Sequence, residues 1–219
     1  MGKQLAFVVV MVAGLAQAQS ANRGEEAPWT VQSGKTVGTD QTVVWGQVGF
    51  PDAPSVQLVH GIDALTEIGG KISLDYGDHG VIDGCCHVGL DFQFLIRRNF
   101  FDNGKLWIAG TFQPGFILDF PANTTIFGLA FPLGVQFGFP VNSVLTFNGS
   151  FDLAMYCLFG TNFSTGTFAL PILFGGGAEY LLQRNLALTF QLKIGPTIFT
   201  AGGSAQFTLY ALAGIAYRF

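Results

Sequence analysis

The sequence predicts an all-β fold, a single closed antiparallel up-and-down barrel that crosses a membrane with about ten strands. The composition is 49% hydrophobic but only 11% charged, whereas ordinary soluble domains are roughly 25% charged. After the N-terminal leader, no segment approaches the roughly 18 consecutive apolar residues of a membrane-spanning helix. Apolar residues instead alternate with small or polar ones, a pattern that gives a barrel wall one face for lipid and one for the lumen.

The first residues, 1–18, are expected to be a secretory signal peptide. Lys3 supplies the positive charge that precedes an apolar stretch over 5–16, and Ala16-Gln17-Ala18 matches the small-x-small cleavage pattern. The stretch is shorter than the roughly 20 residues that a membrane-spanning helix needs. The mature chain would begin at Gln19 and be exported.

The rest of the chain divides into two parts. Residues 19–40 are polar and are expected to form a loosely ordered periplasmic leader, and 41–219 form the barrel. The formal net charge of −4 argues against nucleic acid as a partner, because phosphate binding needs a basic patch. Three cysteines are an odd number for an exported protein and do not indicate a disulfide framework; the role of Cys85, Cys86 and Cys157 stays open.

The alternation is clearest in the second half of the chain. Over 145–157 the odd positions are mostly large and apolar, and the even positions are mostly small or polar. The apolar faces of the last five strands carry no charge, as expected where Arg or Lys at the lipid midplane costs about 2–4 kcal/mol. Because Trp45 interrupts the alternation of the first hairpin, a barrel of eight strands is an alternative. The ten expected strands lie near 42–50, 54–61, 66–77, 85–98, 104–119, 125–139, 143–158, 167–182, 185–200 and 204–219.

The connections between these strands alternate in character when the C-terminus is placed in the periplasm. Periplasmic turns are expected at 61–66, 99–103, 140–142 and 183–184. Outer loops are expected at 51–53, 78–84, 121–124, 159–166 and 201–203. An even strand count with both ends on the periplasmic side is consistent with this arrangement.

The last residues resemble the terminal signal of bacterial outer-membrane proteins: Gly214, two residues, the aromatic Tyr217, one residue, and Phe219. In that family the barrel-assembly machinery reads this signal; Leu212 stands where a polar residue is common. The chain resembles small barrels such as the transmembrane domain of outer membrane protein A and porin-like barrels. The segment 61–70 resembles uncharacterised barrels of myxobacteria-like Gram-negative bacteria. The resemblance implies an outer-membrane location, in contact with membrane lipid and lipopolysaccharide.

Most charged side chains are expected to point into the lumen. Two interpretations stay open. Acids and bases can pair to fill a narrow interior, since buried charges persist when they are paired. Alternatively, an acidic outer mouth lies over a basic constriction at Lys71 and Lys193 and selects among ions or solutes. The lumen-facing candidates are Lys71, Asp75, His87, Asp91, Arg97, Asp119, Asp152, Glu179, Lys193 and Arg218.

These observations predict a structural wall component or a narrow passive pore for small ions or solutes. The expected protein is a monomer without enzymatic activity, cofactor or metal. The alternatives are an enzyme at the outer rim that acts on lipid or peptide, and a receptor or adhesin. The enzyme would need a nucleophile paired with a base, and no such pair stands out. The receptor would need longer outer loops.

Overall fold

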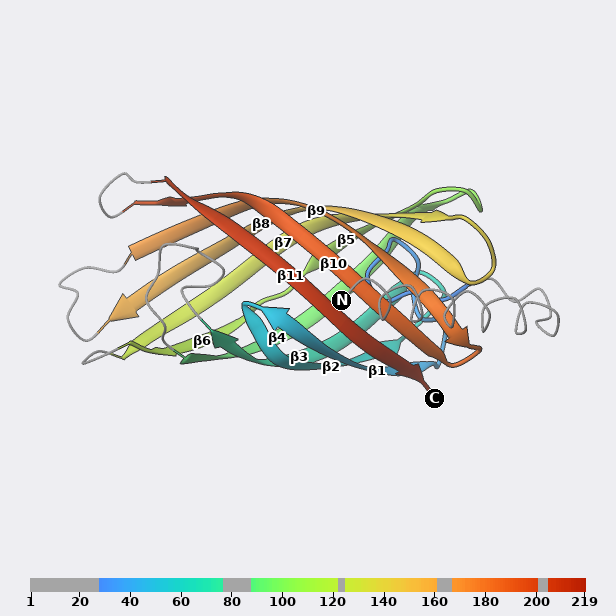
Figure 1. Cartoon of the computed structure of the whole chain (residues 1–219), viewed down its shortest axis with the longest axis horizontal. Coiled ribbons are helices and arrows are strands. Elements are labelled where there is room, and N and C mark those ends of the chain that lie inside the picture. The colour runs from blue at the N-terminus through green and yellow to red at the C-terminus, as the bar shows by residue number, and fades with distance from the viewer. Residues whose placement is uncertain (1–27, 77–87, 122–124, 161–166, 201–204) are drawn as a thin grey trace, which may run out of the picture.

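The computed structural model describes residues 28–76, 88–121, 125–160, 167–200 and 205–219. Eleven strands run through them, and within these ranges no helix is long and apolar enough to cross a membrane. The strands are steeply tilted around a single barrel (Figure 1). They are β1 (Thr42–Phe50), β2 (Asp52–Gly61), β3 (Thr66–Tyr76), β4 (Val88–Asp102), β5 (Trp107–Phe112), β6 (Gly115–Phe120), β7 (Ile126–Pro140), β8 (Leu145–Gly160), β9 (Thr167–Gln183), β10 (Leu186–Phe199) and β11 (Ala205–Arg218).

The eleven strands form ten positions in a closed antiparallel wall. Strands β5 and β6 both pair with β4 on one side and β7 on the other, so they are two halves of one wall strand. The break falls at Pro114, which has no N–H to donate to the ladder. The Phe94 N–H donates to the Pro114 carbonyl at 2.8 Å, and the Gln113 N–H donates to the Pro132 carbonyl at 2.9 Å, so bonding continues across the break. Pairing of β3 with β4 and of β1 with β11 completes the ring.

The expectation of ten strands is confirmed, and the eight-strand alternative is wrong. The first hairpin belongs to the wall, because β1 pairs with β11 over eight residue pairs, from Val43–Arg218 to Phe50–Ala211. Trp45 does not break the alternation. It is buried on the inner face together with Val43 and Gln47, and its Nε1 donates to the Thr189 hydroxyl at 3.0 Å.

One expected turn, at 99–103, is wrong. Strand β4 continues to Asp102 with a bulge between Asn99 and Phe101, and the turn to β5 follows. Asn99 is buried and donates to the carbonyl of Gly34, so this residue acts as an inward anchor within the strand. The chain reverses at Gly104, whose φ of 77° suits glycine.

The two ends of the barrel differ in their connections. The connections between β2 and β3, β4 and β5, β7 and β8, and β9 and β10 lie at the end that also carries the C-terminus, which we call the turn end (Figure 1). At the β2–β3 turn, Asp63 Oδ1 accepts the backbone N–H groups of Leu65 and Thr66, each at 2.7 Å. These bonds, that of Leu65 first, hold the pKa of Asp63 below its ordinary value. The opposite end is called the loop end.

The wall is apolar outside and largely polar inside. Along β8, Thr146 and Asn148 face the lumen and are buried, whereas the intervening Phe147 is 50% exposed on the outer surface. The outward faces of β7 to β11 carry no charged residue. The charged residues of these strands, Asp152, Glu179, Lys193 and Arg218, all follow the inward parity.

The interior also holds two apolar clusters. One, at the turn end, joins inward side chains such as Val43, Val59 and Leu95 to Trp29 and Val31 of the segment before β1. The other lies on the β6 to β9 side of the lumen and includes Ile117, Ala130, Ala154, Tyr156, Leu158 and Ala169. The expected loose leader is therefore wrong for residues 29–37, which the barrel encloses.

The seam between β1 and β11 requires a glycine at position 49. A Cβ at Gly49 would lie 2.0 Å from the Ala211 carbonyl oxygen, whereas one at Gly46 would meet nothing within 4 Å. We expect Gly49→Ala to lower the free energy of unfolding of the barrel by about 1–3 kcal/mol through overpacking, and therefore to lower its urea midpoint. Gly46→Ala serves as the matched control and should leave the midpoint unchanged. Equal midpoints for both variants would contradict the tight seam.

Candidate functional site

A short irregular segment, residues 29–37, fills the lumen at the turn end; we call it the plug. It is the first described part of the chain and enters the barrel at the end that carries the C-terminus (Figure 1). Seven of its side chains are buried: Trp29, Thr30, Val31, Gln32, Ser33, Thr36 and Val37. Its backbone belongs to no strand, so its buried N–H and C=O groups need partners outside a ladder.

Arg97 supplies donors to the plug carbonyls. Its Nη1 donates to the carbonyl of Val31 at 2.6 Å, and its Nη2 donates to those of Thr30 and Lys35 at 2.9 and 3.1 Å. The guanidinium also forms an ion pair with Glu67, at 2.6 Å between Nη2 and Oε1, with both side chains fully buried. One arginine thus satisfies three carbonyls, and the carboxylate of Glu67 balances its charge.

Two glutamates supply acceptors to the plug N–H groups. The Glu179 oxygens accept the N–H groups of Val31 and Gln32, each at 2.8 Å. The second oxygen of Glu67 accepts the Val37 N–H at 2.9 Å. Charge-assisted bonds of this kind are stronger than those between neutral groups. The plug is therefore held from β3, β4 and β9, on different sides of the wall.

Aromatic packing closes the turn end around these bonds. Trp29 donates through Nε1 to the Arg184 carbonyl at 3.0 Å, and the Arg218 guanidinium lies 5.3 Å from its ring centroid. Gly34 passes so close to Trp107 that a Cβ there would lie 2.5 Å from the Trp107 carbonyl carbon. The plug and the wall are packed as a protein core.

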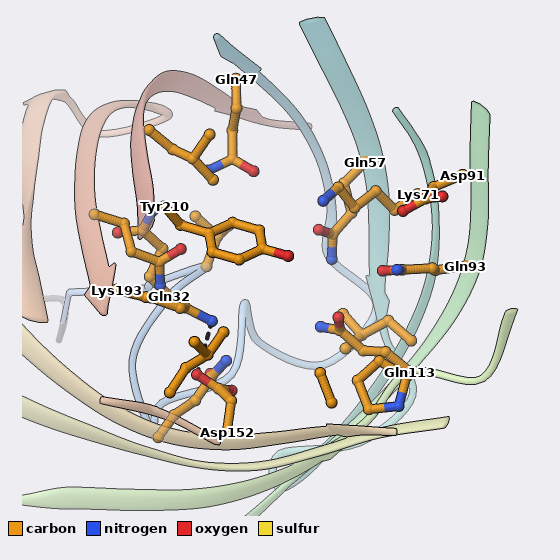
Figure 2. A pocket seen from close by; sticks show the side chains of 18 of the residues that line it. Gln32, Gln47, Gln57, Lys71, Asp91, Gln93, Gln113, Asp152, Lys193 and Tyr210 are labelled. Carbon is orange, nitrogen blue, oxygen red and sulfur yellow. Dashed lines mark ion pairs between the residues drawn. The ribbon is translucent and has the colours of Figure 1, made fainter. Parts of the chain in front are cut away.

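A polar cavity lies between the plug and the loop end. Its empty volume is about 870 Å³, counted with the open solvent at its edge. Val31 and Gln32 of the plug border it, and side chains from most of the wall strands surround it (Figure 2). Seven glutamines line it, and we call them the glutamine collar: Gln32, Gln47, Gln57, Gln93, Gln113, Gln136 and Gln191.

Charged groups in the cavity wall occur in both signs. Lys193 Nζ lies 2.9 Å from Asp152 Oδ2, and the Ser150 hydroxyl donates to the same oxygen at 2.9 Å. Lys71 and Asp91 also border the cavity, on the neighbouring strands β3 and β4. The basic constriction considered for Lys71 and Lys193 is thus accompanied by carboxylates at the same level.

The lumen candidates from the sequence fall into three groups in the structure. Arg97, Glu179 and Arg218 contact the plug; Lys71, Asp91, Asp152 and Lys193 border the cavity; Asp75 and Asp119 are buried nearer the loop end. His87 and the cysteine pair Cys85-Cys86 lie outside the described residues. Cys157 is an unpaired thiol on the outward parity of β8. Within the described ranges no three His, Cys, Asp or Glu side chains gather as metal ligands.

The C-terminal residues lie in the seam of the wall. Gly214 faces Gln47 of β1 and Thr189 of β10, and the Phe219 N–H donates to the Thr42 carbonyl at 2.8 Å. The rings of Tyr217 and Phe219 pack edge to face, 5.0 Å between centroids, on the outer side. Recognition of Gly214, Tyr217 and Phe219 by the barrel-assembly machinery stays a prediction.

Sequence reasoning missed the plug. The expected strand register points Gln93, Gln113, Gln136 and Gln191 into the lumen but leaves out Gln47 and Gln57, the other collar members of the wall. The available signal for the plug was Trp29-Thr30-Val31, an apolar group within a polar leader, together with inward charges near one end of the barrel. The signal for the collar was the repeated placement of glutamine at inward positions. Neither pattern says which inward residues meet.

Comparison with known proteins identifies no family. No protein-family model matches the chain, and no curated protein matches it. Among solved structures, the KdgM porin in complex with disordered oligogalacturonate is similar, with 10% identity, a TM-score of 0.38, and coverage of 82% of this chain and 99% of that one. This likeness is too low to carry a functional argument, and the closed barrel is established by the strand pairing itself. The finer resemblance to myxobacterial barrels stays a prediction.

Loss of the Glu179 carboxylate should release the plug. In a background where the native cysteines are serine, we expect a cysteine at the fully buried Ser33 to react slowly with a water-soluble thiol reagent. Adding Glu179→Ala should raise the rate at least tenfold, because two buried N–H groups lose their acceptor, and each buried group left unsatisfied costs about 1–3 kcal/mol.

Asp102→Ala is the matched control for this prediction. It removes a carboxylate that is exposed at the same end of the barrel and that, within the described part of the chain, bonds only to the Gly104 N–H of its own turn. The rate should stay at the parent value. A parent rate as fast as that of free cysteine would contradict the enclosed plug.

Proposed function

We propose that the chain is an integral outer-membrane barrel that serves as a narrow passive pore for small polar solutes, with the plug limiting passage. The observation that carries this proposal is the polar cavity inside an apolar wall, closed toward the turn end by the plug. A purely structural wall component needs no such cavity. The proposed protein acts as a monomer, since one chain closes the ring.

The outer surface supports a membrane location. Large apolar side chains such as Phe147, Phe174, Phe190 and Phe207 are each at least half exposed, which soluble monomers avoid over extended patches. In a bilayer these side chains contact lipid, and the wall strands pair with one another around a closed ring that leaves no open sheet edge, as hydrocarbon requires. The proposed orientation places the turn end in the periplasm and the loop end at the lipopolysaccharide leaflet, with insertion through the barrel-assembly machinery.

The interior supports a pore of small bore. Ten strands leave less room than the 16 to 18 strands of the open porins. The plug fills the turn end and the cavity occupies the middle, so a solute that enters the cavity leaves through the turn end only when the plug shifts. The ion pairs between Arg97 and Glu67 and between Lys193 and Asp152 place balanced charge along this path.

The lipid-facing wall can be tested by a charge at two heights. Leu192 lies near the middle of β10 on the outward face, and Leu186 is the first residue of the same strand at the turn end. We expect Leu192→Arg to cost about 2–4 kcal/mol of folding free energy in lipid vesicles, and Leu186→Arg about 0–1 kcal/mol. The measurement is urea unfolding of the vesicle-inserted barrel. Equal costs at both sites would contradict a bilayer centred on this wall.

The pore itself can be tested by conductance in planar bilayers. The folded wild-type protein should give small or infrequent steps, and Glu179→Ala should raise the mean conductance severalfold because the plug is released. Asp102→Ala should match the wild type. If none of the three proteins conducts, and heat-dependent gel mobility shows that each is folded, the result would favour a purely structural role in the membrane over a pore. Equal conductance with and without Glu179 would show that the plug does not limit passage.

A further inference from the structure

The glutamine collar has a composition that simple filling of a lumen does not require. Seven neutral amides surround one cavity, and they come from the plug and from strands on different sides of the ring. In Figure 2, Gln57 from β2, Gln93 from β4 and the hydroxyl of Tyr210 from β11 point toward the middle of the cavity. Pores that select ions use rings of charged side chains or backbone carbonyls. A ring of side-chain amides suits another class of solute.

Two of these amides are buried, and their NH₂ groups have no hydrogen-bond acceptor among the described residues. Gln32 and Gln47 are 2% and 5% exposed, and both border the cavity. Among the described residues, neither Nε2 atom has a hydrogen-bond acceptor. The opposite atom of Gln32 is engaged, because its Oε1 accepts from Asn148 Nδ2 at 3.1 Å. Buried polar atoms in proteins are almost always satisfied, so these two donors call for an acceptor inside the cavity.

The chemistry of the lining indicates which molecule brings that acceptor. An amide carries both a donor and an acceptor, so it can bond a hydroxyl group in either role. The Lys193–Asp152 pair neutralises itself, and a charged guest would have to lose its hydration without an unpaired partner there. Trp45, Tyr156 and Tyr210 add aromatic surface to the lining, and such surface packs against the C–H faces of a saturated ring or chain.

We infer that the glutamine collar is a binding site for a small neutral polyhydroxylated solute, of the size of a monosaccharide or a sugar alcohol. Gln32 and Gln47 donate to its oxygens from two sides, and the remaining amides bond its hydroxyl groups. This inference deepens the proposed function by naming the solute class, and it rests on that function only in requiring that solutes reach the cavity from water.

The test is calorimetric titration of the folded protein, produced from the full chain and held in detergent micelles, with named probes. Glucose and mannitol are the neutral probes, and gluconate and glucosamine are their charged counterparts. We expect saturable binding of at least one neutral probe, with both charged counterparts about tenfold weaker or worse. Heat-dependent gel mobility confirms that each sample is folded.

Two variants assign the binding to the collar. Gln47→Leu removes a donor that has no acceptor in the described protein, so the barrel should still fold while the affinity falls about threefold to tenfold, the worth of one hydrogen bond. Gln57→Leu tests a collar residue of the adjacent strand β2 in the same way. Gln183→Leu makes the same change at the exposed last residue of β9, and the affinity should not change.

The outcomes separate this inference from the pore. A folded wild-type protein that binds neither neutral probe, or that binds a charged counterpart more tightly than its neutral parent, overturns the binding site even when the protein conducts. Binding without conductance overturns the pore and leaves the site. Binding that neither glutamine variant weakens overturns the assignment to the collar.

Discussion

The interior of this barrel depends on how a buried stretch of irregular backbone finds hydrogen-bond partners. The N–H and C=O groups of the wall are used in the strand ladder, so the plug can be satisfied only by side chains. Arg97 and the two glutamates, Glu67 and Glu179, supply these donors and acceptors, and the Arg97–Glu67 contact balances the cation. Removing Arg97 or Glu67 leaves the other charge buried without its partner, which is strongly destabilising. The position of the plug therefore depends on ionisable side chains of β3, β4 and β9 together.

The rest of the interior follows from that arrangement. With the plug held at the turn end, Trp29 and Val31 complete an apolar cluster that the wall alone could not close. A second apolar cluster occupies part of the lumen on the β6 to β9 side. Between them the inward positions are mostly polar, and they border the cavity. The barrel is thus packed like a protein core at its turn end and encloses a polar cavity at its middle.

Much of the fold could be predicted from the sequence, because the period of a strand is a local property. The alternation along β8, with Thr146 and Asn148 inside and Phe147 outside, can be predicted from the sequence alone. The turn near Asn99 was wrongly expected because asparagine is common in turns, whereas here its amide is an inward anchor for Gly34. Local composition does not distinguish these two uses of one residue.

The candidate site could be predicted only in part, because it depends on which inward residues meet. Arg97 and Glu179 were recognisable as lumen residues, but their partners are backbone atoms of a segment far away in the sequence. The polar composition of 19–40 indicated a loose leader, since its Trp29 and Val31 offer too little apolar surface to fold by themselves. Only a preformed lumen with matching donors and acceptors orders such a segment.

The most direct test of this account is amide hydrogen exchange of the wild-type protein in lipid nanodiscs, read at Val31, Gln32 and Val37. Their N–H groups donate to Glu179 and Glu67 inside the lumen, so the account predicts protection comparable to that of wall amides in β8 and β9. Exchange of these three amides at the rate of an unstructured chain, while the wall stays protected, would contradict it.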